Sequence, residues 1–180
     1  MTDRGRSADT AYAGRMGEPA VRAADPSQHD IVVALLTGSW GGTTVVAHGV
    51  SYDAATLPAL IAWLDGAPVG LLTYVLGPDD LEVVTIDAAV PGAGVGTALL
   101  AAAADRAWAA GASRVWLITT NDNLRALRFY QRRGMRLAGL APGAVAASRV
   151  LKPSIPLVGE HGIEIRDELT LELRQGWFRR

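Results

Sequence analysis

The stretch VPGAGVGTALL (90–100) decides the fold, because it sets three alternating glycines between an apolar run and an alanine-rich run. Gly92, Gly94 and Gly96 carry no Cβ, so the backbone there can approach a ligand closely. The first N–H groups of a helix lack helical partners and carry partial positive charge, so anions bind at that end. The stretch therefore predicts a phosphate-binding helix start. A tight turn used only for packing is the alternative.

Two better-defined phosphate motifs do not fit this stretch. A P-loop requires a lysine after its last glycine, and none is present. A dinucleotide fingerprint would require a glycine at Thr97 and a parallel βαβ unit. The hairpin signal Asp65-Gly66 instead predicts antiparallel strands upstream.

The flanking sequence predicts a mixed α/β fold with a mainly antiparallel sheet flanked by helices. Apolar periodicity favours a short helix over 27–36, and we expect Gly38, Gly41 and Gly42 to break the chain after it. The expected strands cover 43–52, 56–65, 67–76, 81–90, 114–120, 135–140 and 168–173. Helices are expected over 97–110 and 124–133, with Asn121, Asp122 and Asn123 as N-cap candidates for the second, and a helical or irregular stretch reaches about 151.

Composition limits the kinds of protein this chain can be. Its 180 residues favour one domain over 21–180, preceded by a polar, flexible tail over 1–20. The formal net charge of −1, with scattered basic residues, gives no sign of a nucleic-acid or membrane partner. No apolar run has the length of a membrane span and no signal peptide is evident, so we expect a cytoplasmic protein.

The residues that usually hold metals are scarce. The chain has no cysteine, which excludes thiolate nucleophiles and Cys-type zinc sites. Its three histidines lie far apart without ligand-like spacing, so no metal site is predicted.

A second motif lies about 30 residues downstream of the glycines, in TTNDNLRALRFYQRRGMR (119–136). Together the two motifs resemble the GNAT superfamily of N-acetyltransferases, over about residues 20–175, and in particular an uncharacterised bacterial branch. Two positions depart from the family pattern. Pro91 stands where an Arg or Gln is usual and removes one polar phosphate contact, and Met135 replaces the usual Phe.

The resemblance implies a sheet splayed in its middle and acetyl-CoA as cofactor, bound by backbone amides of the glycine loop. Backbone N–H groups of about 86–90 are expected to polarise the thioester carbonyl. The cofactor-binding residues that it implies are Ala88, Ala89, Val90, Gly92, Ala93, Gly94, Val95, Gly96, Thr97, Asn123, Ala126, Phe129 and Tyr130. It also implies that Tyr130 acts as general acid for the leaving thiolate; packing in the core is the alternative for Tyr130 and is expected for Phe129.

The general base is expected on the strand before the glycine loop. Glu82 and Asp87 are the candidates, with Glu82 ranked slightly first. Their odd separation puts them on opposite faces unless a bulge resets the register. Glu82 as a solvated strand carboxylate and Asp87 as a cap of local amides are the alternatives.

The acceptor is expected to be a primary amine on a small molecule or peptide. Trp40 and His48 are the substrate-binding candidates, with Tyr52 and Trp63 beside them and ordinary packing as the alternative. The polar clusters 160–161 and 166–168 could receive a cationic amine or simply solvate a hairpin. Protein N-terminal or lysine acetylation and a non-catalytic acyl-CoA-binding module remain open. A homodimer through the C-terminal strands, with Trp177 and Phe178 at its interface, is a further prediction.

Overall fold

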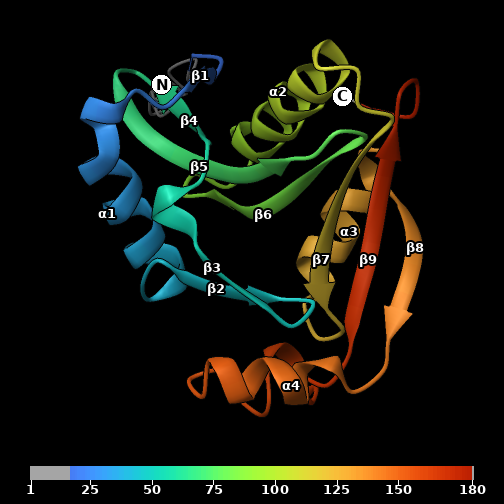
Figure 1. The fold of residues 1–180 in the computed structure, drawn as a ribbon. Coiled ribbons are helices and arrows are strands. Elements are labelled where there is room, and N and C mark those ends of the chain that lie inside the picture. Colours follow the sequence, from blue (N-terminus) through green and yellow to red (C-terminus); the bar gives the residue numbers. More distant parts are fainter. Residues whose placement is uncertain (1–16, 180) are drawn as a thin grey trace, which may run out of the picture.

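The computed structural model describes residues 17–179, in which seven strands form one sheet in the order β1-β4-β5-β6-β7-β9-β8 (Figure 1). The strands of this sheet are β1 (Ala20–Ala23), β4 (Ala59–Leu64), β5 (Ala67–Leu76), β6 (Asp80–Ala88), β7 (Arg114–Thr120), β8 (Arg136–Ala141) and β9 (Glu168–Arg174). A separate hairpin pairs β2 (Thr44–Ala47) with β3 (Val50–Asp53). The helices are α1 (His29–Trp40), α2 (Val95–Ala109), α3 (Leu124–Arg132) and α4 (Ala144–Leu151), with short 3-10 turns η1 (Pro26–Gln28), η2 (Ala54–Thr56) and η3 (Glu160–Gly162).

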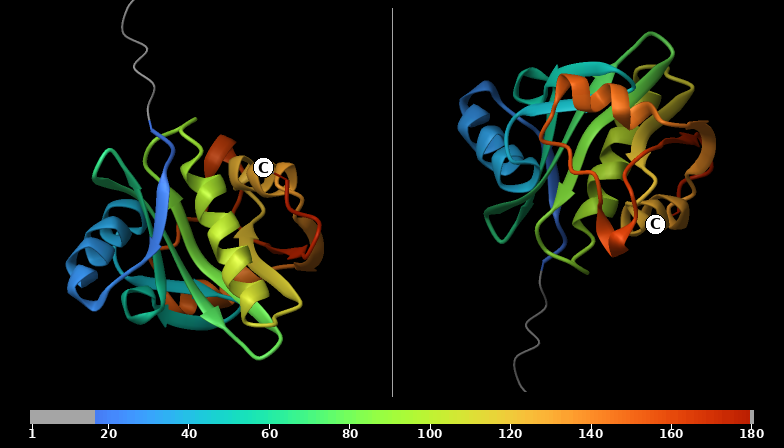
Figure 2. Two further views of the ribbon diagram at one scale, coloured as in Figure 1. Left: turned by 90° about the horizontal axis from the view of Figure 1, so that it is seen from above. Right: turned by 90° about the horizontal axis from the view of Figure 1, so that it is seen from below.

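Two hydrophobic clusters occupy the two faces of the sheet. On one face, α2 buries Leu99, Leu100 and Ala103 against β4, β5, β6 and β7, and its many alanines let the helix lie close to the strands. On the other face, α1 buries Val32 and Leu36. Figure 2 shows α1 and α2 on either side of the sheet.

The sheet opens between β6 and β7, as the resemblance implied. These strands pair in parallel only from Asp80 with Arg114 to Val83 with Leu117. Beyond Val83, β6 runs on to Ala88 while β7 turns toward β9, so the two strands diverge (Figure 1). Because backbone groups in the gap lack a neighbouring strand, they are available to a ligand.

A bulge in β6 sets which side chains face this opening. Tyr74 pairs with Val83 but Thr73 pairs with Thr85, so Val84 is the extra residue on β6. The inserted residue shifts the alternation by one position. Glu82 and Asp87 therefore lie on the same face of the sheet, the face covered by α1 and β2-β3, and the open question of their register is settled.

Three elements differ from the sequence-based expectations. The segment 43–52, expected as one strand, forms the β2-β3 hairpin with a turn at His48-Gly49, where both residues have positive φ. The helix expected over 27–36 begins at His29 and runs through Gly38 to Trp40, and Gly41, with a φ of 71°, is its C-cap. The expected tail over 1–20 lies mainly outside the described residues, and its last residue, Ala20, begins β1.

Gly70 holds α2 against the sheet. A Cβ at this position would lie 2.6 Å from Val95 Cγ1 and 2.8 Å from the Asp87 carbonyl oxygen, so only glycine lets the start of α2 lie this close to β5 and β6. We predict that Gly70→Ala lowers the free energy of unfolding by about 1–3 kcal/mol. Urea unfolding followed by circular dichroism measures this change.

Gly38→Ala is the matched control. It lies within α1, where a Cβ meets nothing within 4 Å, so it should raise stability by about 0.5–1 kcal/mol. Equal effects of the two alanines would contradict the packing role of Gly70.

Candidate active site

The glycine loop leads into α2 with its backbone donors free. Gly94 is the N-cap with φ of 76°, a left-handed conformation that glycine adopts without strain. The Ala98 N–H donates to the Gly94 carbonyl at 2.9 Å, whereas residues 95–97 show no backbone acceptor for their N–H groups within the described chain. We call residues 92–97 the phosphate cradle. It offers the three N–H donors and the helix N-terminus that a diphosphate requires.

The exposed edge of β6 supplies a further donor. The Ala89 N–H donates to the Val69 carbonyl at 2.9 Å, so it is occupied by β5. Because donors alternate along an antiparallel strand, the N–H of Ala88 points away from β5, toward the gap left by β7. Of the predicted residues at this edge, Ala88 rather than Ala89 therefore has an N–H free to polarise a carbonyl.

A groove of about 320 Å³ runs beside the phosphate cradle, between the end of β6 and α3. Its lining residues are Ile86, Asp87, Ala88, Gly96, Asn123, Arg125, Ala126, Phe129, Tyr130 and Glu160. Asn123 is the N-cap of α3 and accepts a hydrogen bond from the Ala126 N–H at 3.1 Å, which confirms it as the capping residue. A Cβ on Gly96 would lie 3.1 Å from Phe129 Cζ, so this glycine lets α3 pack against the start of α2.

Tyr130 lies where the groove meets a second cavity. Only 7% of the residue is exposed, its ring packs edge-on against Phe129 at 5.3 Å between centroids, and it lines both spaces. Burial raises the pKa of its phenol well above the ordinary value. Its hydroxyl therefore keeps a proton at neutral pH and can donate it to a leaving group. Tyr130 therefore both packs in the core and lines the cavity.

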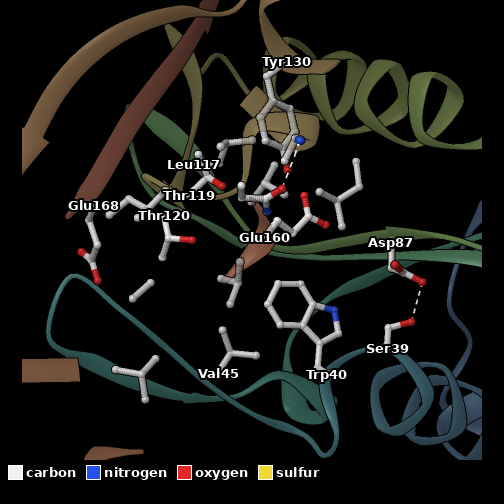
Figure 3. A pocket seen from close by; sticks show the side chains of 18 residues that line it. Ser39, Trp40, Val45, Asp87, Leu117, Thr119, Thr120, Tyr130, Glu160 and Glu168 are labelled. Atoms are coloured by element: carbon white, nitrogen blue, oxygen red, sulfur yellow. Dashed lines mark hydrogen bonds between the residues drawn. The ribbon is translucent and has the colours of Figure 1, made fainter. Parts of the chain in front are cut away.

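The second cavity, which we call the acceptor cavity, has a volume of about 470 Å³. Its walls come from α1, β2, β6, β7, α3, η3 and β9. Figure 3 shows Tyr130 and Trp40 on opposite sides of it, with Asp87, Glu160 and Glu168 around the same space. These three carboxylates line the cavity without a lysine, arginine or histidine among the lining residues. The acceptor cavity is therefore acidic.

Glu168 is the most buried of these carboxylates. It is 4% exposed and accepts hydrogen bonds from Ser148 Oγ at 3.0 Å and from the His48 backbone N–H at 3.1 Å. No cationic side chain of residues 17–179 forms an ion pair with it. A buried carboxylate without a cationic partner favours binding of a cation.

The second and third carboxylates of the acceptor cavity come from η3 and β6. Glu160 is exposed and donates its backbone N–H to Asp122 Oδ2 at 3.3 Å. Asp87 accepts a hydrogen bond from Ser39 Oγ at 2.5 Å, and it lines both the groove and the cavity. Sequence reasoning left Glu160 and Glu168 open between binding an amine and solvating a hairpin, and it missed Ser39. The glutamate that begins the apolar strand β9 was the available signal for Glu168.

Glu82 lies beside the acceptor cavity rather than among its lining residues. Its carboxylate contacts His48 Nε2 at 2.9 Å and accepts a hydrogen bond from the Tyr52 hydroxyl at 3.1 Å. His48 thus connects the β2-β3 turn to β6, and it does not line the cavity, in contrast to Trp40. Trp63 packs with the α1 cluster. Of the N-terminal substrate-binding candidates, only Trp40 faces the acceptor cavity.

A smaller space of about 210 Å³ adjoins the acceptor cavity between β2 and α4. Val145, Ile155 and Ile165 make most of its wall apolar, and it shares Trp40 and Glu168 with the acceptor cavity. Lys152 also lines this space and donates from Nζ to the Thr44 carbonyl at 2.7 Å. Figure 2 shows α4 beside β2 in the view from below.

The two aromatic residues predicted for a dimer interface make packing contacts within the chain. Trp177 and Phe178 pack against the main core, and the Arg136 guanidinium lies 3.9 Å from the centroid of the Trp177 ring. The homodimer stays a prediction. Within residues 17–179, no helix is both long and apolar enough to span a membrane.

The hydrogen bond between Tyr52 and Glu82 predicts that the free energy of unfolding depends on pH. Burial and the Glu82 charge raise the pKa of Tyr52 from 10.0 to about 12. Between these values the unfolded phenol ionises first, so the hydrogen bond stabilises the fold fully below about pH 10 and loses its effect toward pH 12. The stability difference between wild type and Tyr52→Phe, measured by urea unfolding, should be constant up to pH 10 and shrink by pH 11.5. When Glu82→Gln is present in both proteins, the stability difference should decrease less between pH 10 and pH 11.5. If the stability difference between wild type and Tyr52→Phe is the same at pH 10 and pH 11.5, the contact is ruled out.

Comparisons with known proteins identify the family of this chain. The model of the Acetyltransferase (GNAT) family matches residues 33–135. Two uncharacterized Bacillus subtilis (strain 168) proteins are similar in sequence. YxbD is 39% identical over 143 residues, covering 79% of this chain and 90% of its own, and YdhI is 45% identical over 104 residues, covering 58% and 65%. The chain belongs to the GNAT acetyltransferase family.

Solved structures show the same fold. The IAA acetyltransferase from Bacillus cereus ATCC 14579 has a TM-score of 0.66 at 21% identity, covering 87% of this chain and 99% of its own. Nourseothricin acetyltransferase has a TM-score of 0.62 at 24% identity, covering 88% and 99%. A GNAT family acetyltransferase from Elizabethkingia anophelis, solved with acetyl-CoA bound, has a TM-score of 0.63 at 16% identity, covering 87% and 98%. The family and fold expected from the two motifs are confirmed.

Proposed function

We propose that this protein transfers an acetyl group from acetyl-CoA to the amino group of a cationic small molecule. The acidic acceptor cavity carries the proposal, because three carboxylates line it without a neighbouring cation in its wall. An ammonium acceptor is attracted to such a site before it is deprotonated. A volume of about 470 Å³ is within the range of small-molecule sites. Acetylation of a peptide amine is the alternative outcome of the acceptor test.

The residues present fit the cofactor. The phosphate cradle presents free N–H groups at a helix N-terminus, and the groove leads from it to Tyr130. The groove is lined by Asn123 and Ala126, the positions expected to contact the pantetheine arm. Acetyl-CoA would supply the thioester, and the free N–H of Ala88 is the donor that would polarise its carbonyl. Tyr130, which lies where the groove meets the acceptor cavity and keeps its proton at neutral pH, favours a catalytic domain over a non-catalytic module.

Two side chains are placed for proton transfer. Asp87 lines both the groove and the acceptor cavity. We therefore assign it the role of general base, which accepts the proton that the acceptor ammonium loses. Tyr130 lies at the same junction and gives its proton to the departing sulfur. The neutral amine nitrogen bonds to the acetyl carbon, the carbon–sulfur bond breaks, and the sulfur leaves with the proton from Tyr130. No covalent intermediate on the protein is required. Glu82, held by His48 and Tyr52, positions the hairpin beside this junction.

Tyr130→Phe tests the acid role. The change removes the hydroxyl but keeps the ring that packs on Phe129, so kcat should fall about 100-fold while the fold is retained. Thiol release from acetyl-CoA with a panel of amines measures this rate. Tyr74→Phe is the matched control, since Tyr74 is buried in the same cluster without lining the cavity, and it should retain most activity. Full activity of Tyr130→Phe across the pH range would refute the acid assignment.

Glu160→Gln tests the acidic cavity. Glu160 is exposed, so the change should leave the fold intact and raise KM about 3- to 10-fold for acceptors with two or more positive charges. The increase should diminish at high salt. Glu164→Gln removes the same charge four residues away, outside the cavity lining, and should leave KM unchanged. If neutral and anionic acceptors or peptides are preferred over small cationic amines, the proposed acceptor class is wrong.

A further inference from the structure

An arginine that the family motifs do not include lies at the phosphate cradle. Arg133 directly follows α3, yet its guanidinium reaches back to the start of α2. Its Nε and one Nη donate to Thr97 Oγ1 at 3.0 and 2.7 Å. The same guanidinium stacks over the Phe129 ring, 4.5 Å from the centroid. Two hydrogen bonds and one ring contact therefore fix this cation at the third residue of α2.

The position is electrostatically unfavourable without an anion. The N-terminus of α2 carries partial positive charge, so a guanidinium there meets charge of its own sign. No carboxylate of residues 17–179 forms an ion pair with Arg133. Partial burial and the neighbouring Arg132 both lower the pKa of the guanidinium, as expected for a cation without a partner. An anion between Arg133 and the helix start would remove this repulsion.

Thr97 also offers a donor to an anion at this position. Its hydroxyl oxygen accepts two hydrogen bonds from Arg133, which leaves the hydroxyl hydrogen as a donor. That hydrogen has no acceptor among the described residues. The Thr97 hydroxyl, its backbone N–H and the guanidinium thus form one group of donors around the end of the cradle.

We infer that Arg133 supplies the cationic contact to the diphosphate of coenzyme A that Pro91 cannot supply. The inference rests on the proposed function, since it requires a coenzyme A diphosphate at the cradle. Pro91 stands at the start of the glycine loop, where the family pattern has an Arg or Gln, and it has neither a polar side chain nor an N–H. The charge enters instead from the residue that directly follows α3, about 40 residues further along the chain. A charge-assisted contact of this kind changes affinity by about 10- to 100-fold.

Calorimetric titration of the full chain tests the inference with three ligands. These are coenzyme A, dephospho-coenzyme A, which lacks the 3′-phosphate, and pantetheine, which lacks all phosphates. Arg133→Ala should raise the Kd about 10- to 100-fold for the first two ligands and leave pantetheine unchanged. Arg132→Ala is the matched control, because this neighbouring arginine is exposed and does not bond Thr97, and it should change each Kd less than twofold.

A compensating substitution separates ligand binding from folding. Placing the usual cation in the loop, as Pro91→Arg in the Arg133→Ala background, should restore most of the lost affinity for coenzyme A. A merely structural role of Arg133 would give a lower melting temperature without ligand and no such restoration. Arg133→Lys, which keeps the charge but loses the two-atom contact with Thr97, should fall between wild type and Arg133→Ala.

The outcomes that overturn the inference are distinct from those that overturn the proposed function. If wild type binds coenzyme A and Arg133→Ala binds it equally well, the inference fails and the proposed function stands. If the loss appears with coenzyme A but not with dephospho-coenzyme A, Arg133 contacts the 3′-phosphate and the diphosphate assignment fails. If wild type binds neither coenzyme A nor acetyl-CoA, both proposals fail.

Discussion

The separation of β6 from β7 is the constraint on which the site depends. Their pairing stops at Val83 and Leu117, so the remaining residues of β6 keep backbone donors that no strand satisfies. Unpaired backbone groups are unfavourable in a folded interior unless a ligand or water binds them. The α2 cluster includes strands on both sides of the opening, whereas the α1 cluster packs on the half that contains β4, β5 and β6. The opening is therefore a property of the whole fold.

The opening carries positive charge at one end and negative charge at the other. At the start of α2, backbone donors and Arg133 create a positive end. In the acceptor cavity, Asp87, Glu160 and Glu168 create a negative end. Tyr130 lies between the two ends with its phenol protonated. In the proposed reaction, an anionic cofactor and a cationic acceptor approach from opposite sides and meet at the buried Tyr130 hydroxyl.

Local sequence predicted most elements because their signals are local. The strands at 67–76 and 114–120 agree with β5 and β7 in their bounds, and Asn123 caps α3 as its side-chain chemistry favours. The errors arise where tertiary contacts outweigh local preference. Gly38 stays helical because α1 is held by its buried face, and the 43–52 run turns back at His48, where Glu82 and Glu168 both bond the turn.

The sequence by itself determined the glycine-bearing helix start and the motif around Tyr130, because spacing within one helix or loop is set by covalent connectivity. Only the tertiary structure decided which charges share a cavity. Glu168 and Asp87 are about 80 residues apart and meet through strand order and through a bulge at Val84 that no local pattern specifies. Arg133 likewise reaches Thr97 only because α3 packs across the start of α2. Contacts between distant segments depend on packing of the entire chain, and so they cannot be read from the sequence spacing alone.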